Sequence, residues 1–184
     1  MLNNQYINKS FIFIFLCLCF HVLASIFSFG FYSDDEHFQI LEPIAYLMGI
    51  NTQLVNDPTW YYWEWEESIR LRPLIQIYFY YLILKPFEYL QNPFILSIII
   101  RIKSAIIGFL SIIYLFFTFK KKYKFKETFF NYFIFFCFWF YPFLHSRTSS
   151  ENLGISVFVF GFCLIYSSNF EKKELINSQE FKKK

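Results

Sequence analysis

The sequence predicts an all-α, polytopic membrane protein with about four transmembrane helices and one or two interfacial helices in its first lumenal or extracytoplasmic loop. Of the 184 residues, 56% are hydrophobic and 26% are aromatic, and the mean hydropathy is +0.35. Soluble domains, by comparison, are about 45–50% apolar. The charged residues are also confined to a few segments that separate long apolar stretches. We therefore expect membrane helices that hold one acidic loop at a membrane surface.

The first predicted span covers residues 11–29, which carry no charge and are interrupted only by His21, Ser25 and Ser28. At about 1.5 Å per residue this stretch nearly crosses a hydrocarbon core of ~30 Å. A cleaved signal peptide is the alternative. The stretch is longer than the apolar part of a usual signal peptide, however, and no small-x-small cleavage site follows before the acidic cluster. We therefore expect a retained helix in which His21 packs against a neighbour.

The loop over residues 31–93 is the main acidic region, with nine acidic and three basic residues. Ser33 and Glu36 have the spacing of a capping box, and the acidic residues beside them suit the positive end of a helix dipole. These features predict a helix over about 34–47. Residues at i, i+4 and i+7 share one helix face, and here they are Asp35, Gln39 and Glu42.

Two residues predict where this helix bends and where it stops. Pro43 cannot donate a backbone hydrogen bond and should bend the helix near Gln39, and Gly49 should end it. Residues 50–59 then have the composition of a loop. The aromatic patch over 60–65 is typical of a membrane–water interface, so the loop is expected to lie against the membrane surface.

The apolar stretch over 74–84 is too short to span a bilayer, and Lys85-Pro86 ends it. We expect a second interfacial or re-entrant helix here, with residues 87–92 as its polar exit. A tilted span that reaches Ile100 is the alternative.

Three further spans are predicted over residues 94–119, 128–144 and 153–168. Arg101 and Lys103 interrupt the first of these spans. Both should sit near one membrane face, because long basic side chains can extend along apolar surface to reach lipid headgroups.

The lysine-rich segments set the predicted topology. Most lysines lie in the loop 120–127 and the tail 169–184, and short basic loops stay in the cytoplasm. Alternation of the spans then places both chain ends in the cytoplasm. It places the loop 31–93 and the short turn 145–151 on the opposite side of the membrane.

Several other classes of function are disfavoured. The four cysteines lie inside apolar stretches and lack histidines at metal-ligand spacing, so they indicate packed or lipid-facing thiols and no disulfide framework. The net charge is +3, and no basic face interleaved with aromatic residues indicates a nucleic acid partner. A transporter should carry ionisable residues inside its spans, and apart from Arg101 and Lys103 few are there.

The acidic loop, together with Arg147 of the turn 145–151, contains the parts needed for glycosyl transfer from a lipid phosphate. Asp35 lies next to Glu36, and the like charge together with partial burial can raise one pKa toward the range of a general base. Flat aromatic faces that suit a sugar ring and cations that suit a phosphate come from Trp60, Trp63, Trp65, Arg70, Arg72 and Arg147. The alternative is a solvated, capped acidic helix without chemistry.

Three motifs follow one another along the chain. They are an acidic pair followed by Gln and Glu, an aromatic-Glu-aromatic motif before an Arg, and a later Ser-Arg-Thr turn. They consist of Asp35, Glu36, Gln39, Glu42, Trp63, Glu64, Trp65, Arg70 and Arg147. Over residues 11–168 this combination resembles the N-terminal part of the Alg9/PIG-B type mannosyltransferases. These are multi-spanning enzymes of the GT-C class that use dolichyl-phosphate mannose.

The resemblance implies that Asp35 is the catalytic base, that Glu36 is its neighbour, and that the other motif residues bind substrate. The reaction would be an inverting single displacement from a polyprenyl or dolichyl phosphate mannose to a lipid-linked glycan, such as a GPI or N-glycan precursor. No metal is expected, because an arginine can stabilise the departing phosphate; a metal at residues 34–37 is the alternative. The implied location is the endoplasmic reticulum membrane in a eukaryote, or the inner membrane in a bacterium.

The sequence departs from the family pattern at three places. Asp34 stands where Pro is usual, Ser is absent after Arg70, and Glu151-Asn152 replaces Ser-Asn. The family pattern is also several hundred residues long and has many more spans. The chain therefore resembles the N-terminal portion of such an enzyme, as expected of a truncated gene model, a split gene or a decayed copy. A second chain that completes the site is one possibility, and the alternative is an inactive fragment or a non-catalytic membrane subunit.

Overall fold

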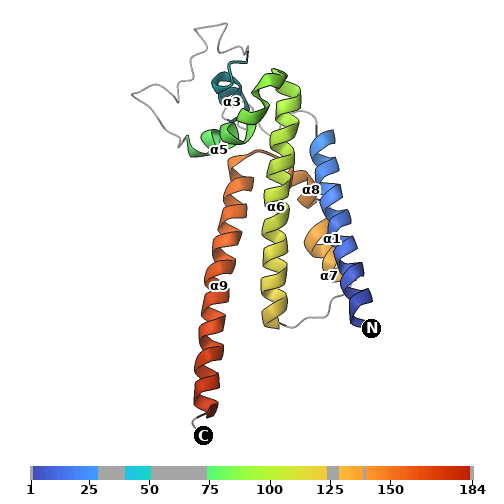
Figure 1. Ribbon diagram of the computed structural model, residues 1–184, viewed down its shortest axis with the longest axis vertical. Helices are drawn as coiled ribbons and strands as arrows, with labels where there is room; N and C mark the ends of the chain where they lie inside the picture. The colour runs from blue at the N-terminus through green and yellow to red at the C-terminus, as the bar shows by residue number, and fades with distance from the viewer. Residues whose placement is uncertain (1, 29–39, 51–73, 124–128, 139, 183–184) are drawn as a thin grey trace.

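The structure, a computed structural model, describes residues 2–28, 40–50, 74–123, 129–138 and 140–182 (Figure 1). All the regular secondary structure in these residues is helical. Within them, three helices are long and apolar enough to cross a membrane. The prediction of an all-α, polytopic membrane protein is therefore confirmed.

The three long helices run side by side, with α6 between the other two (Figure 1). They are α1 (Leu2–Phe27), α6 (Pro93–Tyr123) and α9 (Ser150–Lys182). The predicted spans 94–119 and 153–168 lie within α6 and α9, whereas the predicted span 11–29 extends slightly beyond the end of α1. Both chain ends and the lysine-rich end of α6 lie at one end of the bundle (Figure 1). The predicted alternation places the same three segments on one side of the membrane, and which side that is stays a prediction.

The predicted span 128–144 differs from a single uninterrupted helix. Its described part consists of α7 (Phe129–Tyr132), the π-helical η4 (Phe133–Cys137) and α8 (Phe140–His145). Pro142 accounts for the break, because a proline ring clashes with the carbonyl four residues earlier. That carbonyl belongs to Phe138, whose ψ of 129° leaves the helical region. The chain therefore runs beside α1 and α6 in short pieces.

Two short helices lie at the end of the bundle where α6 begins (Figure 1). They are α3 (Glu42–Leu47) and α5 (Ile75–Leu84), and the 3-10 helix η3 (Lys85–Leu90) follows α5. The prediction of a helix too short to span the membrane is confirmed for α5. Pro43 lies in the first turn of α3, where its missing N–H has no intrahelical role. The bend predicted at Gln39 lies outside the described residues.

Gly49 ends α3, as predicted. It adopts a φ of +69°, a conformation that glycine reaches without the steric penalty of a Cβ atom. The N–H of Gly49 donates to Tyr46 O at 3.0 Å, and the N–H of Ile50 donates to Ala45 O at 3.0 Å. These two bonds are the Schellman pattern that satisfies the last carbonyls of a helix.

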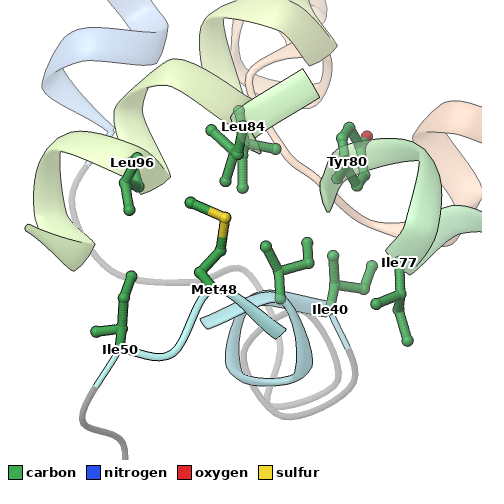
Figure 2. Close-up of a cluster of buried hydrophobic side chains, with 9 residues drawn as sticks. Ile40, Met48, Ile50, Ile77, Tyr80, Leu84 and Leu96 are labelled. Atoms are coloured by element: carbon green, nitrogen blue, oxygen red, sulfur yellow. The ribbon is translucent and has the colours of Figure 1, made fainter. Parts of the chain in front are cut away.

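An aliphatic cluster joins α3 and α5 to the first turns of α6 (Figure 2). Met48 extends from the end of α3 toward Leu84 and Leu96 (Figure 2). Burying one such side chain stabilises the fold by about 1.5–3 kcal/mol when water is the alternative. The buried members are Ile40, Ile44, Met48, Ile50, Ile77, Tyr80, Leu84, Leu96 and Ile100.

An aromatic cluster lies further along α6, where α1 and the short pieces 129–138 meet it. Ring centroids of Phe116 lie 5.0 Å from Phe136 and 5.1 Å from Tyr132. Such ring pairs contribute about 0.5–1.5 kcal/mol each, which matters inside a bilayer because lipid removes the hydrophobic driving force between helices. The buried members are Cys17, Phe109, Ile112, Phe116, Tyr132 and Phe136.

Candidate functional site

Two of the nine predicted site residues, Glu42 and Arg147, lie in the part of the chain that the structure describes. The other seven lie outside the described residues, and their roles stay predictions. They are Asp35, Glu36, Gln39, Trp63, Glu64, Trp65 and Arg70.

Arg147 lies in the connection between α8 and α9, and this connection is buried. Arg147 is 7% exposed, and the residues on either side of it, Ser146 and Thr148, are fully enclosed. The sequence predicts a short polar turn on the side of the membrane opposite the lysine-rich loops. The structure shows that neighbouring elements cover this turn: α5 contacts it through Gln76, and α8, which leads into it, packs against α6 and α1.

Side chains from three helices hold the backbone of this turn. Ser104 Oγ of α6 donates to Arg147 O at 2.6 Å, and Asn152 Nδ2 of α9 donates to the same carbonyl at 2.8 Å. Gln76 Nε2 of α5 donates to Thr148 O at 3.0 Å. Because a buried carbonyl needs a donor, these contacts keep the turn in one position. None of these three donors was predicted from the sequence. The signal that could have indicated them is a polar residue within an otherwise apolar helix, as at Ser104 and Gln76.

The side chain of Arg147 stacks on an aromatic ring. Its Cζ lies 4.6 Å from the centroid of Phe143, a cation–π geometry. Stacking uses the face of the planar guanidinium, whereas a carboxylate or phosphate binds at its edge. The contact with Phe143 is therefore compatible with binding an anion.

Glu42 is buried in the first turn of α3. A carboxylate in the first turn is favoured by the positive end of the helix dipole. α3 packs against α5, and α5 also supplies Gln76 to the turn that carries Arg147. Glu42 lies on α3 and Arg147 lies in the turn after α8, and both of these elements contact α5. The two described site residues are therefore connected through α5, at the end of the bundle where α6 begins.

A band of polar residues, which we call the buried polar seam, separates the aliphatic cluster from the aromatic cluster. Ser25 Oγ of α1 donates to His21 O at 2.9 Å and lies 3.3 Å from Arg101 O of α6. Polar groups inside a membrane are costly and commonly functional, which makes the seam part of the candidate site. Its members are His21, Ser25, Arg101, Ser104, His145, Ser146, Arg147, Thr148, Asn152 and Ser156.

The inner end of the seam is two stacked imidazole rings. The centroids of His21 and His145 lie 5.2 Å apart with an interplanar angle of 28°, so the prediction that His21 packs against a neighbour is confirmed. Gly108 of α6 makes room for the pair. A Cβ atom at position 108 would lie 2.6 Å from His145 Cγ, well inside van der Waals contact.

Among the described residues, no group of three or more His, Cys, Asp or Glu side chains lies close enough together to hold a metal ion. The acidic segment 34–37, which is the metal alternative from the sequence, lies outside these residues.

Comparison with known proteins gives one match. The model of the Alg9-like mannosyltransferase family matches residues 12–183. The matched stretch contains every motif residue of the candidate site, the C-terminal part of α1 and the elements from α3 to α9. No curated protein and no solved structure matches the chain.

Proposed function

The chain belongs to the Alg9-like mannosyltransferase family, and from this premise we propose that it transfers mannose from a dolichyl or polyprenyl phosphate to a lipid-linked glycan. The acceptor that suits this chemistry is a GPI precursor or an N-glycan precursor. The family match supports a membrane glycosyltransferase, and the donor, the acceptor and the residue roles are our proposal. The observation that carries it is the match over 12–183, because one matched stretch holds both the acidic pair and the buried arginine.

In the proposed reaction, Asp35 accepts the proton of the attacking acceptor hydroxyl, and Glu36 tunes the basicity of Asp35 by its charge. The hydroxyl oxygen attacks the anomeric carbon as the bond to the lipid phosphate breaks, so one displacement inverts the configuration. Arg147 and Arg70 stabilise the charge that develops on the departing phosphate. A cation of this kind makes a metal unnecessary, and the proposal includes none.

The remaining motif residues bind the sugars in this proposal. Trp63 and Trp65 offer flat apolar faces to the sugar rings, and Glu64 accepts hydrogen bonds from sugar hydroxyls. The i, i+4 and i+7 spacing predicts that Asp35, Gln39 and Glu42 share one helix face. In this proposal, Gln39 and Glu42 orient the donor or acceptor beside the base.

The setting of Arg147 supports a role in charge stabilisation. Its backbone is fixed by Ser104 and Asn152 before any substrate arrives, and preorganised donors stabilise a transition state without reorganising. Its burial also places the charge where the effective dielectric constant is low, which strengthens attraction to a phosphate.

The test of the base is a pair of matched variants. Asp35→Asn removes the proposed base, and Asp34→Asn makes the same charge change one residue earlier. Mannose transfer from polyprenyl-phosphate mannose, measured in membranes that contain the chain, should fall about 10²–10⁴-fold in Asp35→Asn and remain near the wild-type rate in Asp34→Asn. Equal rates in Asp35→Asn and wild type would refute the assignment.

A wild-type chain that transfers no mannose alone would favour the non-catalytic alternative, an inactive fragment or a membrane subunit. Co-purification with a second membrane chain, followed by recovery of transfer in the mixture, would then show that a partner completes the site.

In this proposal the chain is a multi-pass membrane protein, and its loop 31–93 faces the lumen or the periplasm. The lysine-rich loop 120–127 supports this orientation. An N-glycosylation acceptor placed between residues 51 and 59 should be modified in the endoplasmic reticulum, and an acceptor in the tail 169–184 should not. Modification of the tail alone would reverse the orientation.

A further inference from the structure

Arg101 is a buried cation in α6 that the proposed reaction does not yet use. The sequence suggests that Arg101 and Lys103 both reach lipid headgroups. In the structure Lys103 is exposed, whereas Arg101 is 5% exposed and lies in the buried polar seam. An arginine at such a position inside an apolar span is rare and commonly marks a substrate path.

The side chain of Arg101 is directed toward the end of the bundle that carries α3 and α5. Side chains in an α-helix lean toward the N-terminus of that helix, and the N-terminus of α6 lies at the end of the bundle that carries α3 and α5 (Figure 1). The Nη1 of Arg101 donates to Ser28 O, at the end of α1. Ser28 precedes the proposed base Asp35 by seven residues.

Arg101 and Arg147 occupy adjoining positions of the seam. Ser104 lies three residues after Arg101, and residues at i and i+3 are neighbours on one helix face, with Cβ atoms about 5–6 Å apart. Ser104 Oγ lies 2.6 Å from Arg147 O, and Asn152 Nδ2 lies 2.9 Å from Ser104 Oγ. One hydroxyl thus links the turn that carries Arg147 to the helix turn that carries Arg101.

We propose that Arg101 is a second phosphate-binding residue, which together with Arg147 holds the phosphate of a polyprenyl-phosphate ligand in the buried polar seam. This inference rests on the proposed function, because it concerns the donor of that reaction. A guanidinium has five N–H donors, so the bond to Ser28 O orients the group and is compatible with binding of a phosphate at its edge.

The chemistry of the donor explains why two cations suit this place. The phosphodiester of the donor carries one negative charge, and the phosphate that departs is a monoester that gains a second. A second guanidinium therefore binds the departing group more strongly than the donor, and this difference is what accelerates a reaction. The exposed apolar surface of the neighbouring helices suits the polyprenyl chain, which stays in the lipid.

The test measures binding of a short polyprenyl phosphate to the purified full chain in lipid nanodiscs, by native mass spectrometry. Arg101→Gln removes the proposed contact, and Lys103→Gln is the matched control, with the same loss of charge from an exposed position on the same helix. Binding should weaken about tenfold or more in Arg101→Gln and by less than about twofold in Lys103→Gln. Wild-type binding in Arg101→Gln, or equal losses in the two variants, would overturn the proposal.

Three other probes identify what the site recognises. Polyprenol, which lacks the phosphate, should bind more weakly than polyprenyl phosphate. Inorganic phosphate should compete only at much higher concentration, and phosphatidylserine in the nanodisc should leave the affinity unchanged. Equal binding of polyprenol would overturn the proposal, as would competition by phosphatidylserine, which would show a general affinity for anionic lipid.

Two variants separate the possible failures. Arg101→Lys keeps the charge and loses the planar fork, so it should fold and still bind polyprenyl phosphate at least about threefold more weakly than wild type. Wild-type affinity in Arg101→Lys would overturn the proposal even where Arg101→Gln fails to fold. Asp35→Asn keeps both guanidinium groups, so its loss of mannose transfer tests the proposed function separately from the phosphate site.

Discussion

The helices α6 and α9 have similar lengths, and both can cross a membrane, yet their surroundings differ. Half of the apolar span of α6 (50%) is buried inside the protein, compared with 11% of the span of α9. Glycines show the same contrast. A Cβ atom at Gly108 of α6 would overlap His145, whereas Cβ atoms at Gly154 and Gly161 of α9 would meet nothing within 4 Å.

The contrast teaches that hydropathy does not tell which helix is central. The span of α6 has the higher mean hydropathy, 2.1 against 1.4, and it nevertheless contributes Arg101 and Ser104 to the buried polar seam. A strongly apolar helix tolerates these polar residues because Ser28 O accepts a hydrogen bond from the Arg101 side chain and Arg147 O accepts one from Ser104. α9 presents one face to α6, through Ser156 and Cys163, and leaves large apolar side chains exposed on the rest.

The largest difference between the two helices should appear when each receives a branched side chain in place of glycine. Gly108→Val would force the His145 ring away from α6, and overpacking of this kind costs about 1–3 kcal/mol or more. Gly161→Val faces open space and should cost far less. Thermal unfolding in detergent checks the pair, and equal losses of stability would contradict the proposed difference in packing.

A smaller loss of stability is expected from a substitution where α9 meets the buried polar seam. Asn152→Leu removes a donor from the carbonyl of Arg147 and should cost about 1–3 kcal/mol, because it leaves buried polar groups without one of their bonds. Glu151→Leu changes the adjacent, exposed residue and should have little effect on the unfolding temperature. If Glu151→Leu destabilises the protein as much as Asn152→Leu, the seam does not extend to α9 as described.

Disulfide formation can check how residues 129–138 pack against α1. We expect a smaller effect on stability here than from the substitutions above. Cys137 Sγ lies 2.9 Å from Cys17 Sγ, so a small movement brings the sulfurs to the disulfide distance of about 2.05 Å. Oxidation with copper phenanthroline should form a disulfide between Cys17 and Cys137. Mass spectrometry of proteolytic peptides would detect the bond. Cys17→Ser should abolish the bond and Cys19→Ser should not. Bond formation through Cys19 would contradict the packing of α1.

The smallest effect is expected from Gly161→Ala. Alanine favours an exposed helix by up to about 1 kcal/mol over glycine, and no neighbour opposes the added methyl group. The unfolding temperature should stay the same or rise slightly. A clear loss of mannose transfer in a stable Gly161→Ala variant would show instead that this face of α9 contacts another helix in the working enzyme.

Part of this fold can be predicted from the sequence because long apolar stretches and punctuating residues act locally. The spans over α6 and α9, the short helix α5 and the end of α3 at Gly49 all follow from such local signals. The break at Phe138 also had a local signal in Pro142, and the expectation of one span over 128–144 ignored it. The proline rule that predicted a bend at Pro43 applies equally at Pro142.

The candidate site was less predictable, because burial depends on which helices become neighbours. The charge of Arg147 marks it as a candidate, and nothing local indicates that its turn is buried. Arg101 was placed at the headgroups on the same local reasoning. Gly108 carries no signal of its own, since only its proximity to His145 gives it a role. The motif residues around Asp35 and Trp63 stay predictions, because they lie outside the described residues.

The early end of α8 has a practical consequence for anyone who labels this protein. Short polar connections between membrane helices are the usual places for an epitope, a fluorophore or a protease site. Residues 146–149 look like such a place in the sequence, yet residues 146–148 are enclosed and their backbone is hydrogen-bonded by neighbouring helices. An inserted tag there would behave as a core mutation, so loss of activity in such a fusion would reflect the damaged interior and would carry no information about which side of the bilayer the tag had reached.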